Sequence, residues 1–412
     1  MSGDHAHDGL VSTEPAVPGQ PVLRWASRAR GVPEVSRELD RIWSTVSLTA
    51  ETPEGGLERR IAARSSVMNL VVIAGRSEVG ERAASIVEGL AGRHPSRSLV
   101  VSQADPDGPP WLDAQIHAHC ILPAAGAAET CSELVYLTAG GQTGQHLAGV
   151  VAPLLIHDLP VAIWWPFEPR FESAQTRDLL ALADRLLVDA SGWSGAGLRR
   201  LVQLAALPEA YHLEITDFAL VRQARWREAI ASTFDRPSLL PYLGGLRSIT
   251  VRYAARNPTP GRTNIIKPLY HVAWLADRLG LAVDGRLEPN GATGGYGAVL
   301  RTRRRRIPVR LRPVEAQAPP GTTLAVDLRC ERRRSVLEID VTAMAEGVIV
   351  RASVDGLAMP ERQFHAPRKR ESDLLAQAID EAAHAHVGAA ALRVAASLVG
   401  EPPPAARPGG VH

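Results

Sequence analysis

The sequence predicts two domains: an N-terminal α/β domain with a doubly wound, mostly parallel sheet, and a strand-rich α+β domain after it. The chain has 412 residues, more than a single hydrophobic core usually serves. Between about residues 67 and 190, short β-branched runs alternate with amphipathic stretches, as in parallel strands joined by crossover helices. After about Pro208, two-residue alternation dominates, which is typical of half-buried antiparallel strands.

The α/β domain is expected over residues 33–207. It begins with a helix at 35–43, where Leu39, Ile42 and Trp43 share an apolar face. The strands at 114–122 and 133–138 could be part of the parallel sheet or pair as an antiparallel hairpin. The expected strands are 70–73, 98–102, 114–122, 133–138, 160–165 and 185–189, and the expected helices are 79–92, 143–157, 175–182 and 196–205.

The α+β domain is expected over residues 208–400. One helix, at 264–279, interrupts its strands and ends before Gly280, and Ala-rich helices fill 372–398. The termini, 1–21 and 401–412, are rich in Gly and Pro, so we predict disordered tails there. The expected strands are 246–253, 307–312, 323–329, 335–341 and 348–354.

The composition excludes several classes of protein. Lys+Arg 46 against Asp+Glu 44 leaves a net charge of +2, too small for nucleic-acid binding by counterion release. The most apolar region, 147–167, is interrupted by Pro153, Asp158 and Pro160, so no membrane anchor is expected. Three cysteines, at 120, 131 and 330, are too few and irregular for a disulfide framework, which predicts a protein of the reducing cytoplasm.

Two glycine-rich turns invite comparison with phosphate-binding loops. Gly75 to Gly80 follows an apolar strand, but Glu81 and Arg82 stand where a P-loop has Lys and Ser/Thr. In the second turn, Ala139 replaces the first glycine of a dinucleotide fingerprint. Flexible strand-to-helix turns explain both patterns, so cofactor binding at the second turn is a secondary hypothesis and no cofactor is expected. The glycines of that turn are Gly140, Gly141 and Gly144.

Catalytic and metal-binding motifs are incomplete. His117 and His119 lie on one face of an expected strand and Cys131 could return nearby, a spacing that can hold zinc. No further ligand is visible, so buried polar groups are the favoured interpretation and no metal is expected. Ser194 lacks the Gly-x-Ser-x-Gly spacing of a nucleophile elbow, and no catalytic residue is predicted.

Two segments are candidates for partner contact. One is the arginine run Arg303, Arg304, Arg305 and Arg306, which can guard a sheet edge or meet an acidic partner or phosphorylated metabolite. The other follows a buried strand, where adjacent Trp side chains face opposite ways, so at least one indole needs a second surface. Its residues are Trp164, Trp165, Pro166, Phe167 and Glu168.

The stretch around these tryptophans resembles the OpcA family, the glucose-6-phosphate dehydrogenase assembly proteins. The resemblance is strongest in 154–166, Leu-Leu-Ile-His-Asp-Leu-Pro-Val-Ala-Ile-Trp-Trp-Pro, and in 183–191. The segments 35–43 and 64–72 resemble the family's leading helix and first strand, and Trp226-Arg227-Glu228 its arginine-tryptophan helix. The order and spacing of these pieces, over about residues 33 to 400, make the resemblance fairly specific.

The resemblance implies a two-domain cytoplasmic protein that binds glucose-6-phosphate dehydrogenase, promotes its assembly and raises its activity. It implies no catalytic centre, so the chain is not expected to be an enzyme. The cysteine-based redox control of photosynthetic members is not carried over, because no exposed cysteine pair is evident. The alternative is an enzyme or sensor that binds a nucleotide or sugar phosphate, NADP included, at Gly140–Gly144.

Overall fold

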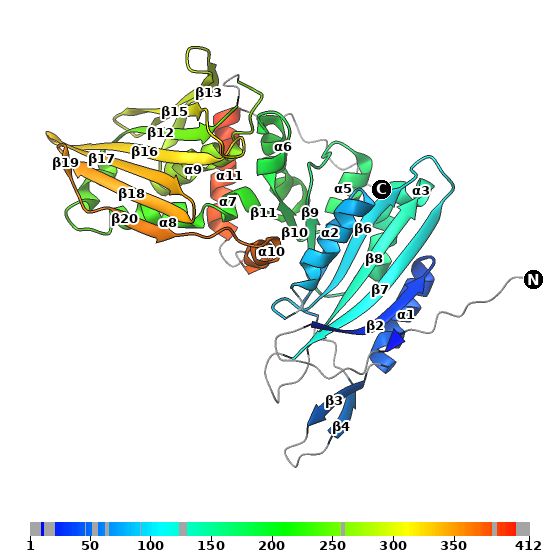
Figure 1. The fold of residues 1–412 in the computed structure, drawn as a ribbon. Coiled ribbons are helices and arrows are strands. Elements are labelled where there is room, and N and C mark those ends of the chain that lie inside the picture. The colour runs from blue at the N-terminus through cyan, green and yellow to red at the C-terminus, as the bar shows by residue number, and fades with distance from the viewer. Residues whose placement is uncertain are drawn as a thin grey trace, which may run out of the picture. The chain divides into compact units, whose positions relative to one another are not determined.

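The computed structural model describes residues 10–11, 21–45, 47–51, 57–61, 66–90, 92–122, 130–256, 260–380 and 385–400 (Figure 1). The chain divides into two compact units. The N-terminal unit comprises Met1–Val188 with Glu371–Ala376, and the C-terminal unit comprises Asp189–Arg370 with Gln377–His412. The domain boundary expected at residues 207 and 208 stays a prediction.

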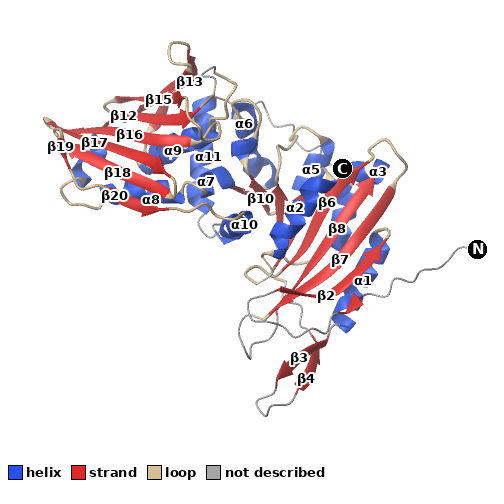
Figure 2. Ribbon diagram, viewed as in Figure 1, coloured by secondary structure: helices blue, strands red, loops and turns tan. Residues whose placement is uncertain are grey.

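A mixed sheet forms the centre of the N-terminal unit (Figure 2). The strands that belong to this unit are, in spatial order, β1 (Leu10–Val11), β2 (Pro21–Ala29), β7 (Trp111–Ile121), β8 (Thr130–Gly140), β6 (Ser96–Ala104), β5 (Met68–Ile73), β9 (Val161–Trp165) and β10 (Arg185–Val188). The strands from β8 to β10 pair in parallel, and β1, β2 and β7 are antiparallel. The doubly wound, mostly parallel sheet that the sequence predicts is confirmed.

Helices cover both faces of this sheet. The β5 sequence Met-Asn-Leu-Val-Val-Ile is buried at every position, as expected of a central parallel strand. From one side, Trp43 of α1 (Val32–Thr45) donates a hydrogen bond to Glu133. From the other, the carbonyl of Ser77 in α2 (Ser77–Glu88) accepts one from Tyr136 Oη at 3.1 Å. Glu133 and Tyr136 are three residues apart on β8, so the two helices lie on opposite faces.

The strands β7 and β8 form the antiparallel hairpin that the sequence left as an alternative. Cys120 lies directly opposite Cys131 in the register, and the two form a disulfide. The expectation that the cysteines form no disulfide framework is therefore wrong for this pair. Cysteine counting failed because the sequence could not fix the register that brings the two side chains together. Cys330 is a buried free thiol.

Two further N-terminal elements differ from the prediction. The single helix expected at 143–157 is split into α3 (Gly141–Gln145), α4 (Leu147–Val151) and the 3-10 helix η1 (Ala152–Leu154). Pro153 cannot supply the N–H that a continuing α-helix needs. The strand β2 was not predicted, although its buried Trp25 suggests one. The remaining elements are β3 (Ser47–Glu51), β4 (Leu57–Ile61) and α5 (Ala174–Leu180).

The C-terminal unit contains a second, largely antiparallel sheet. Its spatial order is β13 (Ala282–Asn290), β14 (Gly295–Arg301), β15 (Arg306–Val314), β12 (Leu246–Ala254), β16 (Thr323–Arg332), β17 (Ser335–Met344), β18 (Gly347–Val354) and β19 (Leu357–Ala358), and β20 (Arg362–His365) also pairs with β18. Only β12 and β15 pair in parallel. Apolar residues alternate with polar ones along β15 to β17, which matches a sheet with one covered face.

The covered face of this sheet packs on α9 (Ile266–Arg278), the helix predicted at 264–279, and on α8 (Ala224–Thr233). The strand-rich α+β prediction is confirmed. Among helices of the described ranges, none combines the length and hydropathy that crossing a bilayer requires. The other elements are η2 (Ala190–Gly192), α6 (Leu198–Tyr211), β11 (Glu214–Asp217), α7 (Phe218–Val221), η3 (Leu240–Gly245), α10 (Glu371–Asp380) and α11 (Ala385–Val399).

Candidate functional site

The N-terminal sheet has its switch point between β5 and β9. From β5 the chain passes through α2 to β6 on one side, and β9 pairs with β5 on the other. In open α/β sheets, ligands bind at the carboxyl ends of the strands beside such a point. Here Phe167, two residues beyond β9, packs on Gly75, two residues beyond β5. A Cβ built on Gly75, whose φ is +70°, would lie 2.9 Å from Phe167 Cζ.

The aromatic segment at the end of β9 is mainly buried. Trp164 and Trp165 are 5% and 4% exposed, and as neighbours on a strand they project from opposite faces of the sheet. Phe167 is 38% exposed and contacts the Trp165 ring edge-on, with centroids 6.1 Å apart. Pro166 and Glu168 are half-buried. The surface that this segment offers to a partner is therefore Phe167 with its flanking residues. The two indoles are buried, and that of Trp165 contacts the Phe167 ring.

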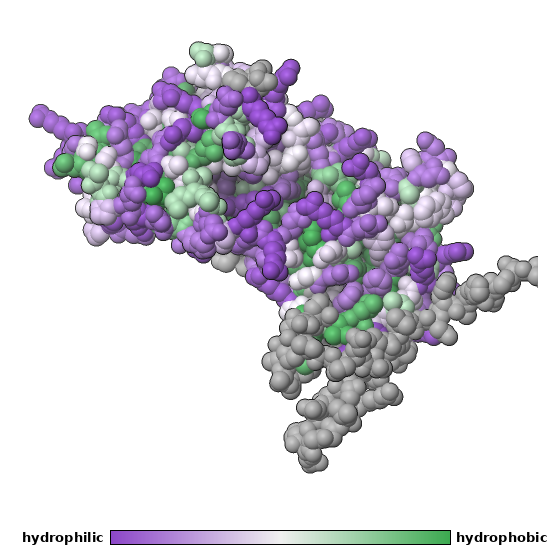
Figure 3. Space-filling view, viewed as in Figure 1, coloured by the Kyte–Doolittle hydropathy of each residue, from purple (hydrophilic) through white to green (hydrophobic). Residues whose placement is uncertain are grey.

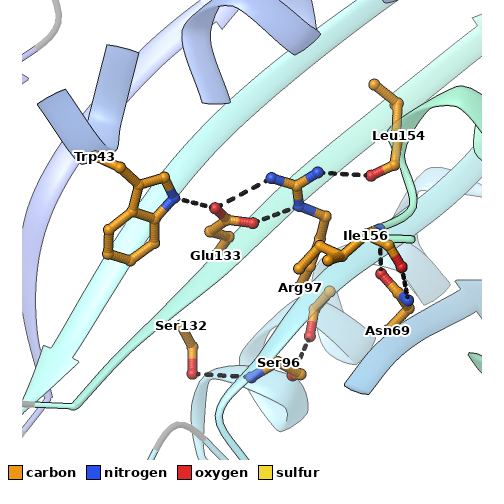
Figure 4. A network of polar contacts seen from close by, with 9 residues as sticks. Trp43, Asn69, Ser96, Arg97, Ser132, Glu133, Leu154 and Ile156 are labelled. Atoms are coloured by element: carbon orange, nitrogen blue, oxygen red, sulfur yellow. Dashed lines mark hydrogen bonds and ion pairs between the residues drawn. The ribbon is translucent and has the colours of Figure 1, made fainter. Parts of the chain in front are cut away.

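A buried ion pair holds the opposite, amino-terminal end of the parallel strands (Figure 4). Arg97 on β6 and Glu133 on β8 are paired in register, and the guanidinium binds the carboxylate through two nitrogens. Arg97 Nη1 also donates to the carbonyl of Leu154 at 2.8 Å, and Trp43 donates to Glu133. The Asn69 side chain makes two hydrogen bonds to the backbone of Ile156. Its Oδ1 accepts from the Ile156 N–H at 2.8 Å, and its Nδ2 donates to the Ile156 carbonyl at 3.0 Å.

This polar network fixes the segment that leads into β9 and the aromatic residues at its far end. Glu133 is fully buried and Arg97 is 7% exposed, so neither can exchange its partner for water. Neither residue was predicted as a structural centre, since a charged residue at the start of a strand ordinarily marks an exposed end. The sequence offered one indication: Arg97 and Glu133 each stand just before an apolar run, at the same position relative to the strand.

Protein atoms surround the glycines of the 140–144 turn. A Cβ on Gly140 would lie 2.0 Å from Trp111 Nε1, and one on Gly141 would lie 2.4 Å from the carbonyl oxygen of Gly108. The carbonyl of Gly144 accepts hydrogen bonds from Gln103 at 2.9 Å and from Gln175 at 2.6 Å. A Cβ on Gly144 would lie 2.7 Å from the carbonyl oxygen of Ala139. These close approaches give each glycine a packing reason and favour the turn interpretation over a phosphate-binding loop.

The arginine run lies at one end of the C-terminal sheet. Arg301 and Arg306 close the β14–β15 hairpin and both bind Asp284, at 3.3 and 2.7 Å. Arg303 and Arg304 are exposed at its tip, and Arg305 is half-buried. No ion pair within the described residues engages these three.

A second arginine-rich tip lies at the same end of this sheet. The register pairs Ile249 with Val309 and Leu246 with Cys330, so the start of β15, the start of β12 and the end of β16 lie side by side. The β16–β17 hairpin turns there, with Arg332, Arg333 and Arg334 exposed. Figure 3 shows hydrophilic residues mixed with apolar ones over this sheet. We call Arg303–Arg305 and Arg332–Arg334 together the arginine tips.

The C-terminal unit also contains a cavity of about 360 Å³. Asp217 at its wall is 5% exposed, accepts a hydrogen bond from Tyr270 Oη at 2.8 Å and caps α7 through the N–H of Ala219. Burial, with the nearby Asp189, raises the pKa of Asp217 to about 7. The cavity is lined by Ile215, Thr216, Asp217, Leu220, Val221, Arg227, Tyr270, Trp274, Arg278, Val387, Gly388 and Leu392.

His271 follows Tyr270 on α9 and is completely buried. Neither ring nitrogen has a hydrogen-bond partner among the described residues, and the ring packs on Trp226 with centroids 5.1 Å apart. Burial, with a smaller effect of Arg227, lowers the pKa of His271 to about 3. The imidazole is therefore neutral and acts as a core side chain under the helix that carries Trp226 and Arg227.

The fold and these sites define a two-unit α/β and α+β protein in which Phe167 packs on Gly75 at the switch point of the N-terminal sheet. Family models for the glucose-6-phosphate dehydrogenase subunit match both parts of the chain: its N-terminal domain over residues 87–205 and its C-terminal domain over residues 213–392. The chain belongs to the OpcA family of glucose-6-phosphate dehydrogenase assembly proteins, as the resemblance in its sequence indicated.

Two curated relatives carry the name "Putative OxPP cycle protein OpcA". The Synechocystis sp. protein is 28% identical over 197 residues, which cover 47% of this chain and 39% of the relative. The Nostoc punctiforme protein is 26% identical over 197 residues, which cover 47% of this chain and 40% of the relative. The matched region thus spans well under half of each relative's length.

Solved structures of similar fold include oxidoreductases. KijD10, a 3-ketoreductase from Actinomadura kijaniata, is 15% identical with a TM-score of 0.42, covering 80% of this chain and 95% of its own. The aldose-aldose oxidoreductase from Caulobacter crescentus is 11% identical with a TM-score of 0.42, covering 81% and 97%. A likeness at this level does not bear on what the present chain does.

Proposed function

We propose that the chain is a non-catalytic assembly factor and allosteric activator of glucose-6-phosphate dehydrogenase in the oxidative pentose phosphate pathway, acting in the cytoplasm. The observation that carries the proposal is the family match, which extends over 87–205 and 213–392 and so involves both units. The proposed partner is the dehydrogenase itself, with no nucleic acid and no membrane involved.

The switch-point crevice supports a non-catalytic role. A dinucleotide needs close approach of its pyrophosphate to the backbone of the first strand-to-helix turn. In this chain the Phe167 ring lies against Gly75 of that turn. The turn also lacks the lysine and hydroxyl residue of a P-loop, because Glu81 and Arg82 stand at those positions. A side chain of the protein thus lies against the turn that a dinucleotide would have to approach.

Activation by a binding protein requires that it bind the active form of the dehydrogenase more tightly than the inactive form, since equal binding shifts no equilibrium. The arginine tips suit the charged part of such an interface, because guanidinium groups bind carboxylates bidentately. Phe167 and Glu168 suit a smaller apolar and acidic contact. Both are proposals about the contact surface.

Activity and particle mass measured together test the proposal. We expect purified dehydrogenase, diluted until its oligomer dissociates, to regain a larger mass and a higher turnover when this chain is added. The chain alone should turn over neither glucose 6-phosphate nor NADP. An unchanged mass and turnover over a range of concentrations would contradict the proposal, and complex formation without a change in turnover would reduce it to a scaffold.

Charge reversal tests the arginine tips. The variant R303E/R304E should bind the dehydrogenase at least tenfold more weakly, and wild-type binding should weaken as salt is raised. The variant R368E/R370E is a matched control, since it changes two exposed arginines of the same unit by the same charge. Equal losses in both variants would show a general charge effect and remove the tips from the interface.

A small-molecule effector is the second candidate function, and the cavity beside Asp217 favours it over the 140–144 turn. Arg227 and Arg278 line the cavity together with a carboxyl group that holds its proton to about pH 7. Calorimetry with glucose 6-phosphate and NADP tests this candidate. Binding that Arg278→Ala weakens would support an effector in the cavity, whereas binding that Arg278→Ala leaves unchanged would remove the cavity as its site.

A further inference from the structure

Three side chains of metal-binding type meet on one face of the N-terminal sheet. They are Glu88, the last residue of α2, with His117 and His119 of β7, and one ligand atom from each lies within 4.8 Å of the others. His117 and His119 are two residues apart on a strand and so project from the same face. Their rings contact edge to face with centroids 5.8 Å apart. A helix end thus supplies the third ligand that the sequence did not reveal.

Packing at both ends of α2 places Glu88 over β7. At the start of the helix, the carbonyl of Ser77 accepts the hydrogen bond from Tyr136 of β8, the strand beside β7. Beyond its end, a Cβ on Gly92 would lie 2.9 Å from Ile121 Cδ1 of β7. Figure 1 shows α2 lying over β6 and β8, and β8 is the neighbour of β7 in the sheet. The position of the carboxylate is therefore a property of the fold.

The three side chains are available as ligands. Within the described residues, no hydrogen bond or ion pair engages the Glu88 carboxylate or a ring nitrogen of His117 or His119, and all three side chains are half-buried. Burial, together with the neighbouring imidazole, lowers the pKa of His117, and burial lowers that of His119. Neutral imidazole is the form that binds a metal ion.

We propose that Glu88, His117 and His119 form a binding site for a divalent transition-metal ion of the zinc type. Two imidazole nitrogens and one carboxylate oxygen suit zinc, whereas magnesium and calcium take oxygen ligands. Zinc binds such ligands at about 2.0–2.2 Å, so the three ligand atoms, which lie within 4.8 Å of one another, must move closer together on binding. Three protein ligands leave a fourth position for water or for a donor from another molecule.

The neighbouring cysteines are not part of this site. Cys120 and Cys131 are joined to each other and are fully buried. Cys120 is next to His119 in the strand, so its side chain projects from the opposite face. The disulfide instead fixes the hairpin register that holds the two histidines. The proposed ligand set is therefore His, His and Glu, and Cys131, considered from the sequence as a possible neighbour of the histidines, is not part of it.

Zinc titration of the full chain tests the proposal. Calorimetry with ZnCl₂ should show a site that H117Q/H119Q loses and that E88Q weakens by about tenfold or more, while MgCl₂ gives no binding. Saturating zinc at about 100 times Kd should raise the Tm of the wild-type chain by roughly 5–10 °C, and should leave the Tm of H117Q/H119Q unchanged.

A matched control separates this site from other histidines. H146Q/H157Q removes two exposed histidines of the same unit and should bind zinc as the wild type does. The sequence also has the pairs His5/His7 and His384/His386. If H117Q/H119Q keeps the full stoichiometry, or if the wild-type chain takes up no zinc, the proposal is overturned. Circular dichroism of each variant confirms that it is folded, and the cobalt absorption spectrum reports the ligands directly.

Discussion

Tyr270 donates a hydrogen bond to the buried carboxyl group of Asp217 at 2.8 Å, and the next residue on the helix, His271, is a buried imidazole without a partner among the described residues. Burial shifts the two pKa values in opposite directions from their ordinary values. The pKa of Asp217 rises from 3.8 to about 7, and that of His271 falls from 6.5 to about 3. Both groups are therefore uncharged in the folded protein between about pH 4 and 6.5, and both would be charged in the unfolded chain.

The two groups should oppose each other in the pH dependence of stability. The contribution of Asp217 is fully present below its unfolded pKa of 3.8 and is lost as pH rises through about 7. The contribution of His271 is fully present above its unfolded pKa of 6.5 and is lost as pH falls toward about 3. Between about pH 4 and 6.5 the two slopes, each up to about 1.4 kcal/mol per pH unit, should largely cancel.

Single substitutions should uncover the two slopes. In Asp217→Asn only the His271 contribution remains. The free energy of unfolding of this variant should therefore increase, relative to that of the wild type, as pH rises from 4 to 6.5. In His271→Leu the opposite trend should appear, because Asp217 remains. Urea denaturation at a series of pH values measures both. Parallel pH profiles for the two variants and the wild type would show that neither group is shifted.

The buried ion pair should be sensitive to the loss of one partner. Glu133→Gln leaves the Arg97 guanidinium, 7% exposed, without its carboxylate, and removing one member of a buried pair costs about 3–5 kcal/mol. The double variant R97M/E133Q leaves no buried charge and should lose less than the sum of the single variants. Denaturant unfolding of the four proteins in a double-mutant cycle measures this coupling, and additive losses would show that the pair is not coupled.

The sequence was sufficient for the elements whose burial pattern is local. The apolar runs of β5 and β9 predict central strands, and the alternation along β15 to β17 predicts a sheet with one covered face. The break at Pro153 was also readable, but the apolar residues on both sides of it favoured a continuous helix. Local pattern therefore predicted the fold class and failed at the ends and breaks of helices.

The sites depend on contacts between distant segments, which one sequence does not show. The segment at Trp164–Glu168 was recognised, but its contact with Gly75 joins residues at the ends of two neighbouring strands. His117 and His119 were recognised as possible ligands, whereas Glu88 lies on a helix with no motif around it. The cysteines were counted correctly, yet their pairing depends on the register of the hairpin. In each case the missing information was which segments contact one another in the tertiary structure.

The disulfide should stabilise the N-terminal unit. Cys120 and Cys131 are 11 residues apart in sequence, and closing a loop of this length stabilises the fold by about 3 kcal/mol in the chain-entropy account. The variant C120A/C131A should lose about this amount, and a reducing agent should have little further effect on it. Thermal unfolding with and without dithiothreitol measures both.

The compartment bears on the same bond, because disulfides are rare in a reducing cytoplasm. Alkylation and mass spectrometry of protein from lysed cells report whether the two thiols are paired there. A wild-type protein whose stability is indifferent to reduction would contradict a stabilising role. Cys330→Ala is the control, since its buried thiol has no disulfide partner.

Two glycines in helices give a matched test of packing on α2. Gly80 in α2 leaves room for the Tyr136 ring, since a Cβ there would lie 2.7 Å from Tyr136 Cε2 and Oη. Gly149 in α4 has nothing within 4 Å of an added Cβ. Alanine favours a helix interior by about 1 kcal/mol over glycine, so Gly149→Ala should stabilise the protein by up to that amount. Gly80→Ala should destabilise it, because the contact between α2 and the sheet must open. If both substitutions stabilise, α2 does not lie on Tyr136 as described, and the position of Glu88 over His117 and His119 would lose its support.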